Sequence, residues 1–98
     1  MAYFVTCTFD LKNASGQDYQ NAYADLESIG LKKVIVYAGD KKYVIPTTTT
    51  AGTFTGTSAT SVRDFVREKI KNAFAARRLT SEIFVVVAGD WTWGAQTT

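Results

Sequence analysis

The sequence lacks histidine altogether and holds only one cysteine, Cys7, and one proline, Pro46. The absence of histidine excludes Ser–His–Asp and Cys–His catalysis, and it excludes the zinc sites that combine cysteine with histidine. A lone cysteine forms no intramolecular disulfide, and a thiol on the apolar side of a strand fits a reducing compartment. The sequence therefore predicts a cytoplasmic protein without these kinds of site.

Long apolar runs and a strong charge excess are also missing. No run approaches the ~20 residues that a membrane helix needs, and the N-terminus lacks the basic segment of a signal peptide. Eleven basic and nine acidic residues give a net charge of +2, which does not by itself indicate nucleic-acid binding. We expect one domain, residues 1–98, and no membrane partner.

The first part of the chain predicts a strand and then a helix. Residues 2–10 alternate in character, and alternate side chains of a strand point to opposite faces. One face is apolar and consists of Tyr3, Val5, Cys7 and Phe9, whereas the other consists of Phe4, Thr6, Thr8 and Asp10. Apolar residues at three- and four-residue steps predict a helix over 17–29, which begins after Ser15 and ends at Gly30.

The middle of the chain predicts short strands. Residues 33–38 and 42–45 are expected to form a hairpin around Gly39 and Asp40. The threonine-rich segment that follows contains an alternating stretch, and we expect a strand over about 50–56. The glycines of this stretch are not followed by the Lys-Ser/Thr of a phosphate-binding loop.

The second half predicts a helix and a last strand. The helix begins at Ser58 or Ser61, and its expected apolar stripe consists of Val62, Phe65, Val66, Ile70, Ala73 and Phe74. Residues 82–88 are apolar on both faces, which is typical of a strand that is covered on both sides. The expected order is that of a ferredoxin-like βαββαβ fold in the α+β class, with an extra hairpin and a C-terminal extension. Two helices would cover one sheet face, and a second subunit would cover the other, so we expect a homodimer.

Asp10 is the main candidate for chemistry because it lies at the end of the first strand, on the face that the helices leave open. Two copies of this carboxylate at a dimer axis could bind Mg²⁺ or Mn²⁺, which prefer oxygen ligands. The alternative is an aspartate that accepts hydrogen bonds from backbone amides after a strand. By the same reasoning Asp90 is a turn residue, and Asp25 and Glu27 are surface charges on a helix.

Basic and aromatic side chains supply candidate binding surfaces. The candidate phosphate contacts are Lys12, Arg63, Arg67, Lys71, Arg77 and Arg78. The alternative for those on the second helix is a solvated face, because Asp64 and Glu68 lie among them. Trp91 and Trp93 are candidates for a subunit interface or, alternatively, for stacking on bases. The expected interface consists of Phe4, Thr6, Thr8, Trp91 and Trp93.

The strand end Phe9-Asp10-Leu11 resembles the aromatic-Asp-aliphatic ending of the first strand in the small dimeric subunit of CRISPR spacer acquisition. It also resembles the VapD-type ribonucleases and the antitoxin GhoS, and the layout of Ile45-Pro46-Thr47-Thr48-Thr49 is similar to the middle of those proteins. The resemblance implies a dimer whose sheets pack face to face and whose two strand-end aspartates hold one divalent metal for phosphodiester cleavage.

Two functions from different classes follow. The first is a metal-dependent endoribonuclease of a toxin–antitoxin or phage-defence system, with Asp10 as catalytic metal ligand and RNA or DNA as substrate. The second is a non-catalytic dimeric module, an antitoxin, regulator or phage-encoded inhibitor, that binds a protein partner. A small-molecule sensor with a pocket at the dimer interface is a third hypothesis.

Overall fold

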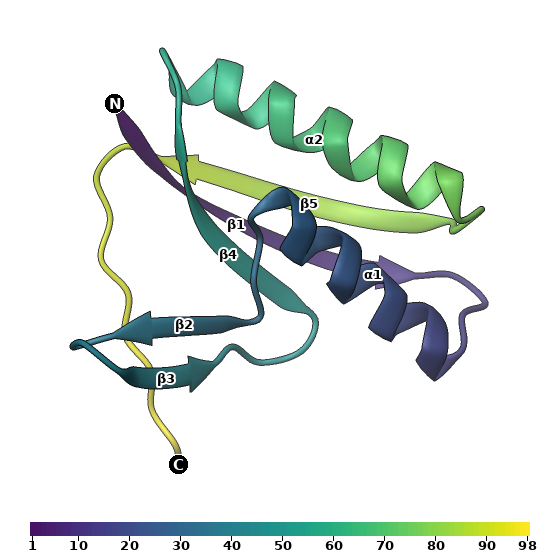
Figure 1. Ribbon diagram of the computed structural model, residues 1–98, viewed down its shortest axis with the longest axis horizontal. Helices are drawn as coiled ribbons and strands as arrows, with labels where there is room; N and C mark the ends of the chain where they lie inside the picture. The colour runs from purple at the N-terminus through teal and green to yellow at the C-terminus, as the bar shows by residue number, and fades with distance from the viewer.

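A computed structural model describes residues 1–98 as five strands and two helices (Figure 1). Their order along the chain is β1 (Ala2–Leu11), α1 (Gly16–Ile29), β2 (Val34–Tyr37), β3 (Lys41–Val44), β4 (Thr49–Thr55), α2 (Ala59–Ala76) and β5 (Ser81–Ala88). The expected elements are all present, and their ends differ from the predicted ones by one or two residues. The chain is therefore an α+β protein with two helices and an antiparallel sheet.

The main sheet has three strands in the order β4-β1-β5, and both neighbours of β1 are antiparallel to it. Strands β2 and β3 form a separate hairpin. This hairpin reaches the main sheet through one bridge, in which the Lys32 amide donates to the Ala51 carbonyl at 2.8 Å and the Ala51 amide donates back at 2.9 Å. Both helices lie on the same side of the main sheet, and the chain after β5 runs back toward the hairpin (Figure 1).

The core lies between the helices and the inner face of β1. Tyr3, Val5, Cys7 and Phe9 are buried, as the alternation of β1 predicts. The helices supply the opposite wall, which consists of Ala22, Leu26, Val62, Val66, Ile70 and Phe74. A helix or sheet that is apolar on one side buries that side against its neighbour, and this burial is the main favourable term of folding.

The helix ends confirm the predicted local signals. The Ser15 hydroxyl accepts from the Asp18 amide at 3.1 Å and the Asp18 carboxylate accepts from the Ser15 amide at 3.0 Å, which is a capping box. Gly30 ends α1 in the left-handed region with φ of 114°, where glycine alone is unstrained. Ser58, rather than Ser61, is the N-cap of α2.

Two predictions about the helix surfaces are wrong. Phe65 was expected in the apolar stripe of α2 but is 52% exposed, because it lies about 100° around the helix from the buried Val66. Asp25 was expected to be a surface charge, but its carboxylate accepts two hydrogen bonds from the Arg77 guanidinium at 2.6 and 2.9 Å. This bidentate pair links α1 to the residue that ends α2.

Strand β5 is covered by the chain on one face only. Phe84 is 68% exposed and Val86 is 48% exposed, although apolar residues on both faces predict a strand that is covered twice. The helix layer covers the side of β5 that carries Ile83 and Val85, whereas Phe84 is mostly exposed and Val86 is about half exposed on the other side. Neither helix is both long enough and apolar enough to cross a membrane.

We predict that Gly52→Ala destabilises the protein by about 1–3 kcal/mol, the usual cost of inserting atoms into a packed region. A Cβ at Gly52 would clash with the carbonyl oxygen of Gly30, so the end of α1 or strand β4 would have to move. Gly94→Ala is the matched control, since a Cβ there meets nothing within 4 Å. Urea denaturation measures both variants, and equal midpoints would contradict the close approach of α1 and β4.

We also predict that Cys7 resists alkylation in the native protein. The side chain is fully buried, and burial raises the pKa of the thiol to about 11. Because the thiolate is the nucleophile, iodoacetamide at about pH 8 should modify Cys7 rapidly in denaturant and very slowly without it. Mass spectrometry of timed samples checks this, and equal rates in the two conditions would contradict the packing of β1.

Candidate functional site

The outer face of the main sheet, which the helices do not cover, is divided into two parts. The C-terminal segment and the β2–β3 hairpin lie over one part. Trp91 stacks on Phe4 at 5.6 Å between ring centroids, and Trp93 contacts Tyr43 at 5.8 Å and Tyr37 at 5.4 Å. These contacts leave a small pocket of about 310 Å³ that Phe4, Thr6, Tyr43 and Trp93 help to line. The rest of the outer face is open to solvent.

The open part is the end of the sheet where β1 finishes and β5 begins. Asp10 pairs in register with Glu82, and Thr8 pairs with Phe84. Directly opposed residues of antiparallel strands point to the same face with Cβ atoms about 4.5–5.5 Å apart. The Asp10 side chain is 68% exposed, and Glu82 is exposed too. Two neighbouring carboxylates therefore face solvent at this end, an arrangement that repels unless a cation lies near it.

Tyr19 and Lys12 hold the Asp10 carboxylate. The Tyr19 hydroxyl, which comes from α1, donates to Asp10 Oδ1 at 3.1 Å and accepts from the Leu11 amide at 3.1 Å. The hydroxyl proton has a second acceptor in the Leu11 carbonyl at 3.4 Å, but the charged oxygen is closer and binds it more strongly. The Lys12 ammonium lies 3.7 Å from Asp10 Oδ2. One oxygen of Asp10 is thus fixed by a hydrogen bond, and the other faces the half-exposed ammonium of Lys12.

The basic residues that the sequence suggested for phosphate contacts are spread along the molecule. Arg63 lies 2.9 Å from an Asp64 carboxylate oxygen, and Arg67 lies 4.0 Å from the same oxygen. The hydrogen bond to Asp25 raises the pKa of the Arg77 guanidinium, so this side chain stays charged and engaged. Lys71 and Arg78 are exposed and form no ion pair.

These basic residues also differ in their distance from Asp10 along the sheet. Helix α2 ends near the start of β5, where the Lys12 amide donates to the Thr80 carbonyl at 2.9 Å. Lys12, Arg77 and Arg78 therefore lie at the same end of the molecule as Asp10. Arg63 is fourteen positions before Arg77 along α2, or about 20 Å away at the rise of an α-helix. The structure brings three of the six candidates toward Asp10.

The predicted interface residues have different surroundings. Phe4 and Thr6 line the pocket under the chain's own C-terminal segment, and both tryptophans pack against the chain's own aromatic rings. Thr8 is exposed beside Asp10, and its hydroxyl lies 3.4 Å from that of Thr49. Asp90 lies in the bend after β5, as predicted for a turn residue.

The two carboxylates have the chemistry of a magnesium or manganese site. Mg²⁺ in proteins is typically bound by one or two carboxylates and keeps several waters, and Mn²⁺ accepts the same hard oxygen ligands. Asp10 and Glu82 supply carboxylates on one face, and their exposure leaves room for waters and for a phosphate group. The donor set therefore fits the divalent metal that was expected at Asp10.

Glu82 and Tyr19 were missed as candidates when the chain was considered as a sequence. Glu82 could have been found by pairing the first and last strands as antiparallel neighbours, which places it opposite Asp10. Tyr19 carried no such signal, because its spacing in α1 is that of a core residue. A scan of the chain against protein-family models gives no match, and no curated protein sequence matches it.

We predict that Tyr19→Phe destabilises the protein by about 0.5–1.5 kcal/mol, the net worth of one hydrogen bond. The change removes the hydroxyl that joins the Leu11 amide to Asp10 and keeps the ring that packs on Phe9. Tyr37→Phe is the matched control, because the Tyr37 hydroxyl forms no hydrogen bond within the chain. Equal denaturation midpoints for Tyr19→Phe and the wild type would contradict this role of the hydroxyl.

Proposed function

We propose that this protein is a metal-dependent endoribonuclease of a toxin–antitoxin or phage-defence system, acting in the cytoplasm, with Asp10 as metal ligand. The observation that carries the proposal is the pair of exposed carboxylates, Asp10 and Glu82, opposed in register at the open end of the sheet. The resemblance of Phe9-Asp10-Leu11 to the strand end of dimeric nucleases points to the same residue.

The proposal includes a ferredoxin-like fold. Such a fold has a central first strand with antiparallel neighbours and two helices on one face. The strand order β4-β1-β5 supports it, and so does the bridge between Lys32 and Ala51, which puts the chain before β2 on the outer side of β4. In this interpretation the edge strand is reduced to the bridge, and the β2–β3 hairpin is the extra element.

Asp10 and Glu82 would hold the divalent metal, Mg²⁺ or Mn²⁺. When bound, the metal lowers the pKa of a coordinated water and neutralises charge on the phosphate. Tyr19 orients Asp10 through the 3.1 Å hydrogen bond to Oδ1. Lys12 offers its ammonium either to Asp10 or to a phosphate oxygen, since the 3.7 Å contact is loose and both side chains are about half exposed or more. Arg77 and Arg78 flank this end of the sheet and would bind RNA phosphates next to those at the metal.

The homodimer is part of the same proposal. Two protomers that pack their open faces would cover Phe84, Val86 and Thr8 and bring the two Asp10 side chains toward a common axis. The exposure of Phe84 (68%) and Val86 (48%) supports this, since large apolar side chains that neighbour one another on a surface often mark an interaction site. In this arrangement Trp91 and Trp93 would lie at the margin of the interface.

A non-catalytic binding module is the second candidate. One observation favours it: Arg63, Arg67 and Arg77 are already paired with carboxylates of the chain, which weakens the case for a continuous phosphate-binding surface. In that function the open face and the aromatic C-terminal segment would bind a protein partner, and Asp10 would be a structural residue held by Tyr19 and Lys12.

We predict that the wild type cleaves labelled single-stranded RNA in Mg²⁺ or Mn²⁺ and not in chelator. Asp10→Asn should lower the rate by about a hundredfold or more, because mutation of even the outer partners of metal ligands typically costs 10- to 100-fold. Asp40→Asn is the matched control, an exposed aspartate in the β2–β3 turn. Duplex DNA assayed in parallel identifies the substrate class.

Cleavage that persists at the wild-type rate in Asp10→Asn would contradict the proposed ligand. The absence of cleavage by well-folded wild type, with both nucleic acids and both metals, would contradict the nuclease and favour the binding module. Circular dichroism of each variant separates loss of activity from loss of fold.

A further inference from the structure

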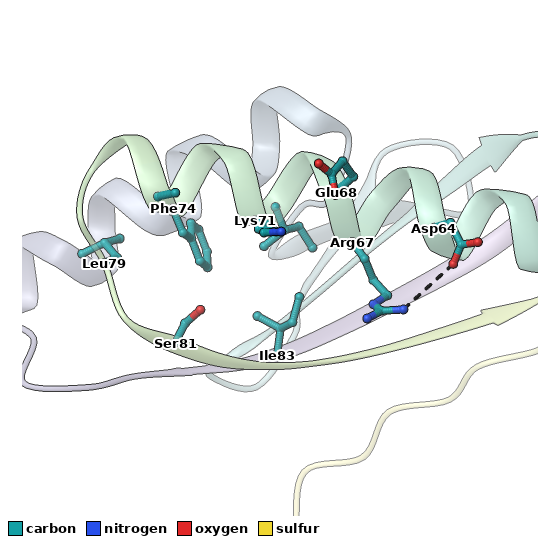
Figure 2. Close-up of a pocket in the computed structure, with 10 residues that line it drawn as sticks. Asp64, Arg67, Glu68, Lys71, Phe74, Leu79, Ser81 and Ile83 are labelled. Atoms are coloured by element: carbon teal, nitrogen blue, oxygen red, sulfur yellow. Dashed lines mark ion pairs between the residues drawn. The ribbon is translucent and has the colours of Figure 1, made fainter.

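A groove of about 610 Å³ runs between α2 and β5 (Figure 2). Ser81 and Ile83, which help to line it, lie on either side of Glu82 in β5. Ile83, Ile70 and Phe74 form its apolar floor. The charged side chains along its upper margin come from α2 and are Asp64, Arg67, Glu68 and Lys71. The proposed nuclease site uses none of these four charges as a metal ligand.

The groove lies beside an unprotected sheet edge. Strand β5 pairs only with β1, so the backbone groups on its other side have no partner strand along eight residues. Proteins commonly protect such an edge with lysine, proline or a bulge. The sequence Ser-Glu-Ile-Phe-Val-Val-Val-Ala has no proline and no basic residue, and its one charge is Glu82 near the start. An edge of this composition is suited to pairing with another strand.

The charges on α2 indicate which protein supplies the strand that pairs with the β5 edge. In order along the helix they are Asp64, Arg67, Glu68 and Lys71, so acidic and basic residues alternate. Two residues at the same distance before and after the midpoint between Arg67 and Glu68 therefore carry opposite charges. A second copy of the helix, turned antiparallel about that midpoint, would present a base to every acid. Asp64 would face the partner's Lys71, and Arg67 would face the partner's Glu68.

We propose that the β5 edge and the groove-facing side of α2 form a two-fold interface with a second copy of this chain. The two β5 strands pair antiparallel and join the main sheets of two protomers into one. The two α2 helices then lie next to each other above the joined strands. Ile83, half-buried at the groove, is covered by the partner strand, and the alternating charges set the register.

The interactions have different roles. Exposed ion pairs contribute little each, and Asp64 and Arg67 are about 60% exposed in the single chain. Affinity therefore comes from the backbone hydrogen bonds of the paired strands and from the covered apolar floor, as in other cases of strand addition. The charges select the correct partner and register, since like charges in the same positions oppose association.

This edge and the open face invoked for the nuclease are different surfaces of the same strand, and Glu82 lies in the paired strand with its side chain on the open face. A chain that uses both surfaces forms a tetramer with dihedral symmetry, and a chain that uses the edge alone forms a dimer. In either case loss of the edge contact halves the molecular mass. The test of the edge is therefore independent of the proposed function.

The experiment is sedimentation equilibrium of the full chain over a concentration series, with a charge swap. Arg67→Glu places an acidic residue opposite the partner's Glu68 at both symmetry-related contacts and should halve the mass, through an increase of about tenfold or more in the dissociation constant. Arg67→Glu combined with Glu68→Arg reverses both signs on both copies, and the wild-type mass should return. Lys41→Glu in the β2–β3 hairpin is the control for the same change of charge and should leave the mass unchanged.

A further variant separates the two surfaces. Thr8→Arg, on the open face, should halve the mass only where open-face packing exists, and Arg67→Glu should halve whatever mass remains. A wild type that is monomeric at all concentrations would overturn the proposal. It would do so even if the β5 edge pairs with a strand of another protein, because the proposed partner is a second copy of this chain. Wild-type mass in Arg67→Glu, or failure of the double variant to restore association, would overturn it as well.

Discussion

The structure depends on the alternation of side chains along β1. This strand is central in the main sheet, with β4 on one side and β5 on the other. Its inner side chains, from Tyr3 to Phe9, are buried beneath both helices. Because the period of a strand is two, the same register that buries Val5 and Cys7 turns Thr8 and Asp10 outward. A shift of one residue would exchange the core with the outer face, so the position of Asp10 is fixed by the packing of the core.

A chain of this size does not cover the whole outer face of its sheet. Two helices cover one side of the sheet, and no third layer remains for the other (Figure 1). The hairpin and the C-terminal segment cover part of the outer face through Trp91 on Phe4 and Trp93 on Tyr43. The remaining part carries the opposed carboxylates of Asp10 and Glu82 together with the exposed Phe84. Apolar surface next to charged groups in this position suits association and ligand binding.

Features set by neighbouring residues could be predicted from the sequence, and features set by distant residues could not. The capping box at Ser15, the left-handed Gly30 and the faces of β1 follow from local spacing. The Asp25–Arg77 ion pair joins residues 52 positions apart, and the opposition of Asp10 and Glu82 requires the register between the first and last strands. The ends of the short strands and the path of the C-terminal segment depend on tertiary contacts in the same way. Asp10 and Lys12 were accessible to sequence reasoning because they lie at the end of one alternating strand, whereas Tyr19 and Glu82 reach Asp10 from other elements.

We propose that the carboxylates at the open end of the sheet bind a divalent metal. The most direct measurement is a calorimetric titration of Mn²⁺ into the wild type and into Asp10→Asn, with Asp40→Asn alongside. We predict saturable binding by the wild type and Asp40→Asn, and loss of that binding in Asp10→Asn while the fold is retained. Equal binding by the wild type and Asp10→Asn, or no binding by a folded wild type, would contradict it.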